Sequence, residues 1–271
     1  MKGDLLIAAA ALSFLCGCQT VQTTSGGVVG VDRPQSMSSL VSSEKFNQDS
    51  AVAYRQVIEE AKKKGLLNRN PAQVERVRRI AGRLTPSTGA FRADAPGWTW
   101  EVNVVSQDEV NAWCMPGGKI AVYTGLLVKL NLNDDELAAV MGHEISHALR
   151  EHGREQYSQA VTQGLIINIV GAVVGAPASA QNASAALIDI FVNRPHSRVD
   201  ETEADRIGVE LAARSGYDPR AAVSLWQKMA KLGGNKPPEW LSTHPSDETR
   251  TRDLEVYSNR VEPLYEAARK R

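Results

Sequence analysis

No other stretch of the 271-residue chain limits its possible folds as strongly as residues 133–147. Asn133 is followed three residues later by Glu136, a pair typical of the cap that opens a helix. His143 and His147 are four residues apart, so a helix places both imidazoles on one face, where they can reach a single metal ion. The segment therefore predicts a helix that carries two metal ligands.

Glu144 follows the first histidine, and the helix turns its side chain by about 100° from that of His143. From there its carboxylate can contact a water on the metal without being a ligand itself. The His-Glu-x-x-His pattern is the zincin motif, in which zinc lowers the pKa of its water to about 7. We expect one zinc ion per chain, with Glu144 as the general base that takes a proton from water and passes it to the leaving amine. The alternative is a surface helix with two solvated histidines.

A zinc site needs a third protein ligand from elsewhere in the chain. His152 is nearest, but five residues of helix turn it by about 140° from the metal face, so we interpret it, like His196, as structural or solvated. Glu201 and Asp205 are four residues apart on a second predicted helix, where Glu201 can bind zinc and Asp205 can accept the free N–H of a ligating histidine. Glu203 competes for the ligand role from a different face of that helix. Acidic residues at a helix start also commonly serve only to offset the helix dipole.

These motifs together resemble the zinc peptidases that include HtpX and the CAAX prenyl proteases. The resemblance covers about residues 100–255 and rests on His-Glu-x-x-His, on Glu-Thr-Glu-Ala-Asp at 201–205, on residues 111–126 and on His-Pro-Ser-Asp-Glu-Thr-Arg at 244–250. It implies that Glu201 is the third ligand and that Asp205 and Arg250 support the ligands. The chain lacks the long apolar segments of the membrane-embedded members, so it resembles a compact lipoprotein branch whose members act in protein quality control at the outer membrane.

The same resemblance implies two further features of the site. An edge strand that an extended substrate can join is expected at Gly118, Lys119, Ile120, Ala121 and Val122. His244 has two open catalytic roles: it donates a hydrogen bond to the oxyanion, or it occupies the open zinc position and holds the enzyme off. The alternative is a loop histidine without a catalytic role.

The N-terminus resembles that of a bacterial lipoprotein. Residues 1–17 carry a lysine and then a short apolar run, as in a signal peptide, and the Gly-Cys pair that follows resembles a lipobox with Cys18 as the lipidated residue. An ordinary cleaved signal is the alternative. Residues 18–43 lack helical periodicity and are expected to be a flexible tether, which leaves residues 44–271 as the peptidase domain. Cys114 then has no disulfide partner and is expected to be a packed thiol.

The hydrophobic pattern predicts an α+β fold: a mostly helical zincin-type domain with a small sheet whose edge strand lies next to the His-Glu-x-x-His helix. Helices are expected at about 43–67, 71–84, 134–151, 200–215, 219–231 and 247–258, strands at 98–105 and 119–123, and a loop at 232–239. Residues 165–176 are apolar but about half the length of a membrane span. They are expected to form either a packed helix beside the site or a flap that faces membrane or substrate.

Charge balance and motif chemistry bound the function. Lysine plus arginine equals aspartate plus glutamate at 31 each and aromatics are 6%, so composition gives no argument for nucleic acid. We expect an endopeptidase for unfolded or misassembled envelope proteins, held by its lipid to the periplasmic side of the bacterial outer membrane. The alternative is a chaperone-like binding module with a closed, regulated zinc site. The oligomeric state and the cleavage preference stay open.

Overall fold

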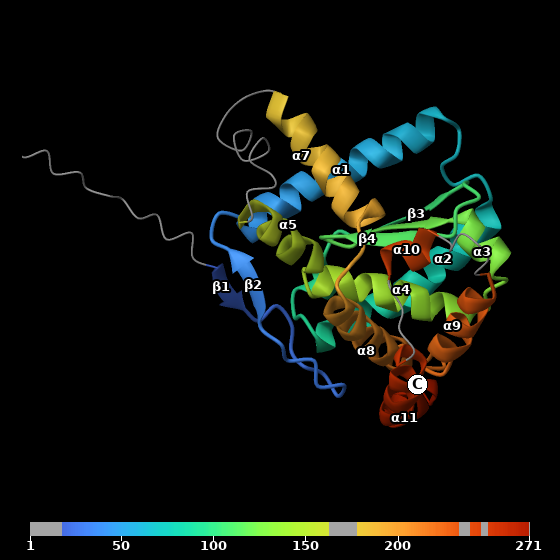
Figure 1. The fold of residues 1–271 in the computed structure, drawn as a ribbon. Helices are drawn as coiled ribbons and strands as arrows, with labels where there is room; N and C mark the ends of the chain where they lie inside the picture. The colour runs from blue at the N-terminus through green and yellow to red at the C-terminus, as the bar shows by residue number, and fades with distance from the viewer. Residues whose placement is uncertain (1–17, 163–177, 233–238, 245–248, 271) are drawn as a thin grey trace, which may run out of the picture.

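A computed structural model describes residues 18–162, 178–232, 239–244 and 249–270 (Figure 1). The expected signal peptide, the apolar segment 165–176 and most of the expected loop 232–239 lie outside the described residues. Within the described ranges, no helix has both the length and the apolar character that crossing a membrane requires.

Helices α4 (Asp134–Leu149) and α8 (Arg198–Arg214) pack against each other in the middle of the molecule. The expected cap opens α4, because Asn133 Oδ1 accepts from the Glu136 N–H at 2.8 Å and Glu136 Oε2 accepts from the Asn133 N–H at 2.9 Å. Ser197 and Asp200 form the same reciprocal pair at the start of α8. Both helices therefore begin at a defined residue, with N–H groups of the first turn satisfied.

Two glycines face each other where α4 and α8 cross. A Cβ on Gly142 would lie 2.8 Å from the carbonyl oxygen of Gly208, and a Cβ on Gly208 would lie 2.8 Å from the backbone nitrogen of His143. Both distances are too short for any residue with a side chain, so the helix backbones touch only because both positions are glycine. The contact lies next to His143 and about two turns from Glu201, so it sets the distance between these side chains.

The sheet next to α4 has three strands, in the order β3 (Glu101–Val105), β5 (Lys119–Tyr123), β4 (Ala112–Met115). β5 pairs parallel with β3 and antiparallel with β4. The turn between β4 and β5 uses Gly117 and Gly118 at φ 76° and 78°, a conformation that glycine adopts without strain.

The predicted edge strand is therefore wrong in its position. Gly118 lies in the turn, and residues 119–122 belong to β5, which is hydrogen-bonded on both sides. The hairpin folds residues 112–115 back along β5, and this makes β4 an outer strand. In the part of the chain that the structure describes, no strand pairs with the other side of β4, and the short helix η3 (Asp189–Asn193) packs beside it.

The remaining elements complete a layered α+β fold, as the sequence predicts. α1 (Ser43–Lys63) and α7 (Ala178–Ile188) lie together on one side of the sheet, and α4 lies on the other side (Figure 1). Around α4 and α8 lie α2 (Pro71–Leu84), α5 (His152–Thr162), α9 (Ala221–Leu232), α10 (Glu239–Thr243) and α11 (Arg250–Arg269). Short helices η1 (Thr85–Ala90), η2 (Ala95–Gly97) and α3 (Thr124–Lys129) connect them.

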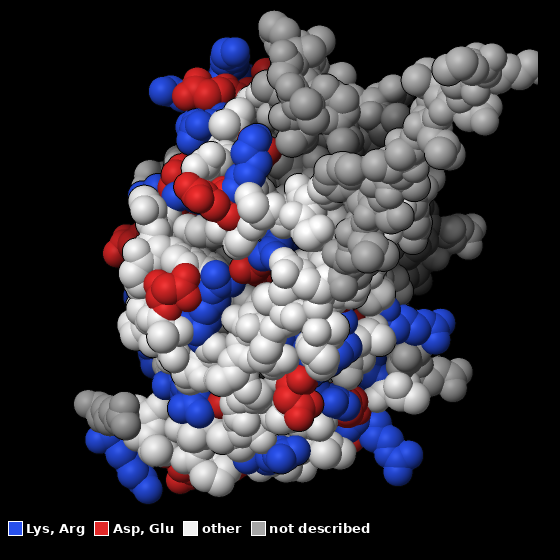
Figure 2. Space-filling model, turned by 90° about the vertical axis from the view of Figure 1, so that its left-hand side faces the viewer, with Lys and Arg blue, Asp and Glu red and all other residues white. Residues whose placement is uncertain are grey.

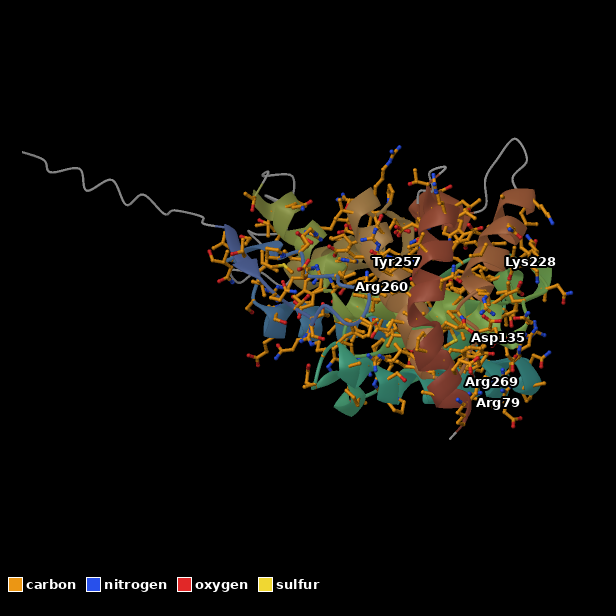
Figure 3. All side chains as sticks on the ribbon, turned by 90° about the horizontal axis from the view of Figure 1, so that it is seen from below. Arg79, Asp135, Lys228, Tyr257, Arg260 and Arg269 are labelled. Carbon is orange, nitrogen blue, oxygen red and sulfur yellow. The ribbon has the colours of Figure 1, made fainter. Side chains whose placement is uncertain are left out.

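Polar contacts join the C-terminal helices to the central pair. Lys228 of α9 donates to Glu136 of α4 at 2.6 Å, and the Asp218 N–H donates to Asp135 at 3.0 Å. Figure 3 labels Lys228 and Asp135 and views the molecule from below, with α11 in front. On the face shown in Figure 2, lysine and arginine are interspersed with aspartate and glutamate, so that face has no patch of one sign.

Residues 18–43 are not the flexible tether that the sequence predicts. Strands β1 (Cys18–Val21) and β2 (Gln35–Ser38) pair antiparallel, and β2 packs against α5. Val29 and Met37 are buried, and Arg33 makes ion pairs with the body of the protein. These contacts are with residues more than 100 positions away in sequence. The local sequence pattern, which lacks helical periodicity, therefore could not predict them. The segment is part of the fold.

The glycine contact predicts a sharp effect of one added methyl group. We expect Gly142→Ala to destabilise the folded chain by about 1–3 kcal/mol, because the new Cβ overpacks the crossing. Thermal unfolding measures this. Gly82→Ala is the matched control: Gly82 lies in α2 with nothing within 4 Å of its added Cβ, so the melting temperature should stay equal or rise. Equal stability of the two variants would contradict the close approach.

Candidate metal centre

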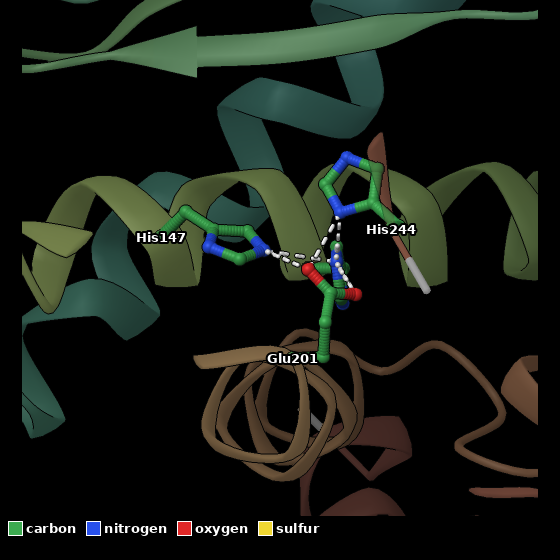
Figure 4. Close-up of side chains that lie close together, drawn as sticks. His147, Glu201 and His244 are labelled. Carbon is green, nitrogen blue, oxygen red and sulfur yellow. Dashed lines mark hydrogen bonds and ion pairs between the residues drawn. The ribbon is translucent and has the colours of Figure 1, made fainter. Parts of the chain in front are cut away.

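Four side chains from three helical segments meet at one buried point. His143 and His147 come from α4, Glu201 from α8, and His244 directly follows α10. Figure 4 shows how His147, Glu201 and His244 point toward one another. His147 Nε2 lies 3.0 Å from His143 Nε2, and His244 Nδ1 lies 3.2 Å from His143 Nε2 and 2.9 Å from Glu201 Oε1. All four residues are at most 5% exposed. The structure thus brings together the three expected ligands and adds His244 to them.

Asp205 and Arg250 support this group from behind. His143 Nδ1 lies 2.9 Å from Asp205 Oδ1, and Arg250 donates to both oxygens of Asp205 at 2.6 and 2.7 Å. Arg250 Nη1 also lies 2.9 Å from Glu201 Oε2. The guanidinium keeps Asp205 an acceptor, so His143 donates through Nδ1 and its Nε2 lone pair faces the meeting point. Both residues lie where the sequence predicts support for the ligands.

The donor set fits a zinc ion. In a tetrahedral site with bonds of about 2.1 Å, neighbouring ligand atoms lie about 3.4 Å apart. The separations here are 2.9–3.5 Å between His143 Nε2, His147 Nε2, His244 Nδ1 and the Glu201 oxygens. A carboxylate and several imidazole lone pairs directed at one buried point repel each other unless a cation lies between them. Three imidazoles and one carboxylate are ligands that zinc accepts.

Glu144 lies beside this group without belonging to it. Its Oε1 accepts from Trp240 Nε1 at 2.8 Å and lies 3.4 Å from His244 Nε2. Burial raises the pKa of the Glu144 carboxyl, against the opposing charges of the nearby histidines. Both residues that contact the carboxylate belong to the α10 segment, so this segment covers the side of the site where Glu144 lies.

The sequence contains five histidines, and ring contacts join all of them into one cluster. His196 stacks on His147 with ring centroids 4.0 Å apart, and burial lowers its pKa to about 3. His152 Nδ1 lies 2.9 Å from His147 Nδ1. Both rings are buried, so neither is solvated. Spacing within one helix does not reveal such contacts; the only signal in the sequence is that a chain so poor in histidine holds all five between residues 143 and 244.

Trp240 and the α10 segment (residues 239–244) pack directly against the four side chains. Trp240 is fully buried, and its ring packs against those of His143 and His244, with ring centroids 5.5 and 4.7 Å apart. The backbone N–H of Trp240 donates to the carbonyl oxygen of Val110 at 3.1 Å, so a hydrogen bond joins α10 to the chain just before β4. The same segment therefore contacts Glu144, the expected metal ligands and the chain just before the outer strand.

Comparison with known proteins identifies metallopeptidases as similar to this chain. The sequence model described as Peptidase family M48 matches residues 71–258. The mitochondrial metalloendopeptidase OMA1 of Arabidopsis thaliana is 42% identical over 161 residues, 58% of this chain and 31% of that protein. OMA1 of Saccharomyces cerevisiae is 33% identical over 178 residues, 63% of this chain and 50% of that protein. The beta-barrel assembly-enhancing protease of Escherichia coli is 32% identical over 170 residues, 59% of this chain and 35% of that protein. The chain thus spans about a third to a half of these relatives.

The geometry predicts that zinc binding depends on Glu201 in particular. Glu201→Gln should lower zinc occupancy after dialysis, because a carboxylate ligand is lost. Metal analysis of the purified chain measures this. Glu210→Gln is the matched control, since Glu210 is a fully buried carboxylate on the same helix and lies away from the centre. Loss of zinc in both variants alike would show a general effect of removing a buried charge and would contradict the ligand assignment.

Proposed function

Because the chain belongs to peptidase family M48, whose sequence model covers residues 71–258, we propose that it is a zinc-dependent endopeptidase with Glu144 as its general base. One observation carries the proposal: a buried carboxylate lies beside a converging zinc-ligand set without joining it. A site that only held the fold together would have no use for such a group. Membership of the compact lipoprotein branch is part of the proposal.

The roles of the side chains follow from their positions. When bound by His143, His147 and Glu201, zinc supplies Lewis acidity that polarises the substrate carbonyl and acidifies the attacking water. Glu144 takes the proton of that water and passes it to the leaving amine. In this structure one oxygen of Glu144, Oε1, accepts from Trp240 and lies 3.4 Å from His244, so that oxygen can accept a proton from water only after both contacts open.

His244 acts as a fourth ligand that holds the resting enzyme closed. Catalytic zinc sites keep one position open, and here His244 Nδ1 lies at that position, 2.9–3.2 Å from the atoms of Glu201 and His143. The same closed set of four supports the second candidate, a chaperone-like module with a regulated zinc site. Glu144 decides in favour of the peptidase, because only catalysis needs it.

The substrate is an unfolded or misassembled envelope protein, bound as an extended strand. Among the described strands, β4 has one unpaired side, and it lies directly before the turn to β5. Strand addition is therefore assigned to β4 and no longer to residues 118–122. Strand addition needs an extended chain and so favours unfolded over folded substrates. The name of one relative, the beta-barrel assembly-enhancing protease, supports envelope proteins as substrates; the name OMA1 is given to mitochondrial enzymes.

The enzyme is held at the periplasmic face of the outer membrane by a lipid on Cys18. Cys18 is the first residue of β1 and pairs with Ser38, so little chain separates the anchor from the packed domain. With so short a spacing, substrates would have to lie close to the membrane surface.

Removing the general base should separate catalysis from metal binding. We expect Glu144→Gln to abolish casein digestion while zinc stays near one per chain, because Glu144 is not a ligand. The wild type should lose activity with a chelator, and Glu59→Gln, an exposed change on α1, should keep it. Substantial digestion by Glu144→Gln would refute the mechanism.

His244→Ala should raise basal cleavage, because the change frees a ligand position and removes one partner of Glu144. Initial rates of peptide cleavage at equal zinc loading measure this. A fall of roughly 100- to 1000-fold would instead assign His244 to the oxyanion. A rate within about twofold of wild type would argue against both roles.

The anchor is tested by mass spectrometry of the mature N-terminus. An acylated Cys18 is expected in the wild type, and Cys18→Ser should leave the protein in the soluble fraction or uncleaved at its signal. An unmodified mature chain that begins at another residue would disprove the lipid anchor.

A further inference from the structure

The two ligand histidines of α4 are supported in different ways. Asp205 contacts Nδ1 of His143 directly. Nδ1 of His147 instead lies 2.9 Å from Nδ1 of His152, whose Nε2 lies 3.1 Å from Glu203 Oε2. His152 is fully buried, and it is the first residue of α5, just beyond the end of α4.

The directions of these hydrogen bonds follow from the charges at the far end. Arg150 donates to Glu203 Oε2 at 2.8 and 2.9 Å, and Arg33 donates to Glu203 Oε1 at 2.6 Å. Arginine does not lose its proton in proteins, so Glu203 remains a carboxylate and can only accept. His152 therefore donates through Nε2, and its Nδ1 is left as an acceptor. His147 then donates through Nδ1, and its Nε2 lone pair faces His143 and Glu201.

We propose that His152 is a positioning residue that fixes the tautomer and ring orientation of the ligand His147 through the chain Glu203–His152–His147. The inference rests on the proposed zinc site and adds to it a support that lies outside both ligand helices. A metal ligand whose other nitrogen is held in this way binds metal more tightly, and loss of such a partner typically costs about 10- to 100-fold in metal affinity.

The N-terminal segment completes this support. Arg33 lies between β1 and β2 and contacts Glu155, Asp200 and Glu203 at once, and its carbonyl oxygen accepts from Arg150 at 2.8 Å. Residues 18–43 thus hold the carboxylate on which the orientation of His147 depends. This gives the packing of that segment a chemical purpose besides stability.

The same residues could instead be taken for a second metal site, since His152, Asp200 and Glu203 offer ligand atoms within 4.8 Å of one another. Two guanidinium groups already occupy the space around their carboxylates. A divalent cation there would lie against the charges of Arg33 and Arg150, which disfavours it. The cluster is therefore neutralised by arginine and acts on the zinc site through His147.

Two isosteric variants separate the two hydrogen bonds of His152. Asparagine places an amide oxygen near the position of Nδ1 and keeps an acceptor for His147. Glutamine places an amide nitrogen near the position of Nε2 and keeps a donor for Glu203. The zinc dissociation constant of each full-length variant is measured by chelator competition, with the absorption spectrum of the cobalt-loaded protein and the melting temperature of the metal-free protein measured in parallel.

We expect His152→Gln to weaken zinc binding by about 10- to 100-fold and to change the cobalt spectrum, because His147 loses its acceptor. His152→Asn should stay within about threefold of wild type, with an unchanged spectrum, because the acceptor is kept. The opposite order, or equal affinity of both variants, would overturn the positioning role. So would a second equivalent of zinc that both variants lose. If Glu201→Gln also left zinc binding unchanged, the zinc site itself would be refuted; if only the His152 variants had no effect, the positioning role alone would fail.

Discussion

The contact of Gly142 with Gly208 is the constraint on which the site depends. It lets two helix backbones touch next to His143, so side chains separated by about 60 residues in sequence converge on one point. Capping pairs define where each helix begins. Because the charged ligands are buried, their repulsion must be offset by a cation and by the partners behind them. The close packing of α4 and α8 thus brings together the side chains that could bind the metal.

The centre is controlled by parts of the chain that lie outside these two helices. Trp240 of α10 donates to Glu144, and His244, which directly follows α10, lies among the expected metal ligands. On the opposite side, Arg33 brings the N-terminal segment to Glu203 and so to His147.

Local patterns predicted the parts of the structure that depend on near neighbours in sequence. The cap at Asn133, the helical spacing of His143 and His147, and the strand at 119–123 needed only such information. Five of the six predicted helices begin and end within about four residues of their predicted bounds, whereas α11 extends to Arg269, well beyond its predicted end at 258. The edge strand was misplaced because the strand at 112–115, which pairs with the second side of β5, was not among the predicted strands. The packing of residues 18–43 and the contact of His152 with His147 likewise depend on long-range ion pairs and helix ends, which periodicity does not report.

The proposed zinc site is tested most directly by an anomalous difference map at the zinc edge, measured on crystals of the zinc-loaded protein. We expect one strong peak enclosed by His143, His147, Glu201 and His244, with nitrogen and oxygen ligands at about 2.0–2.2 Å. A peak enclosed by His152, Asp200 and Glu203, or a zinc ion bound while the ligands of α4 and α8 lie apart, would contradict it.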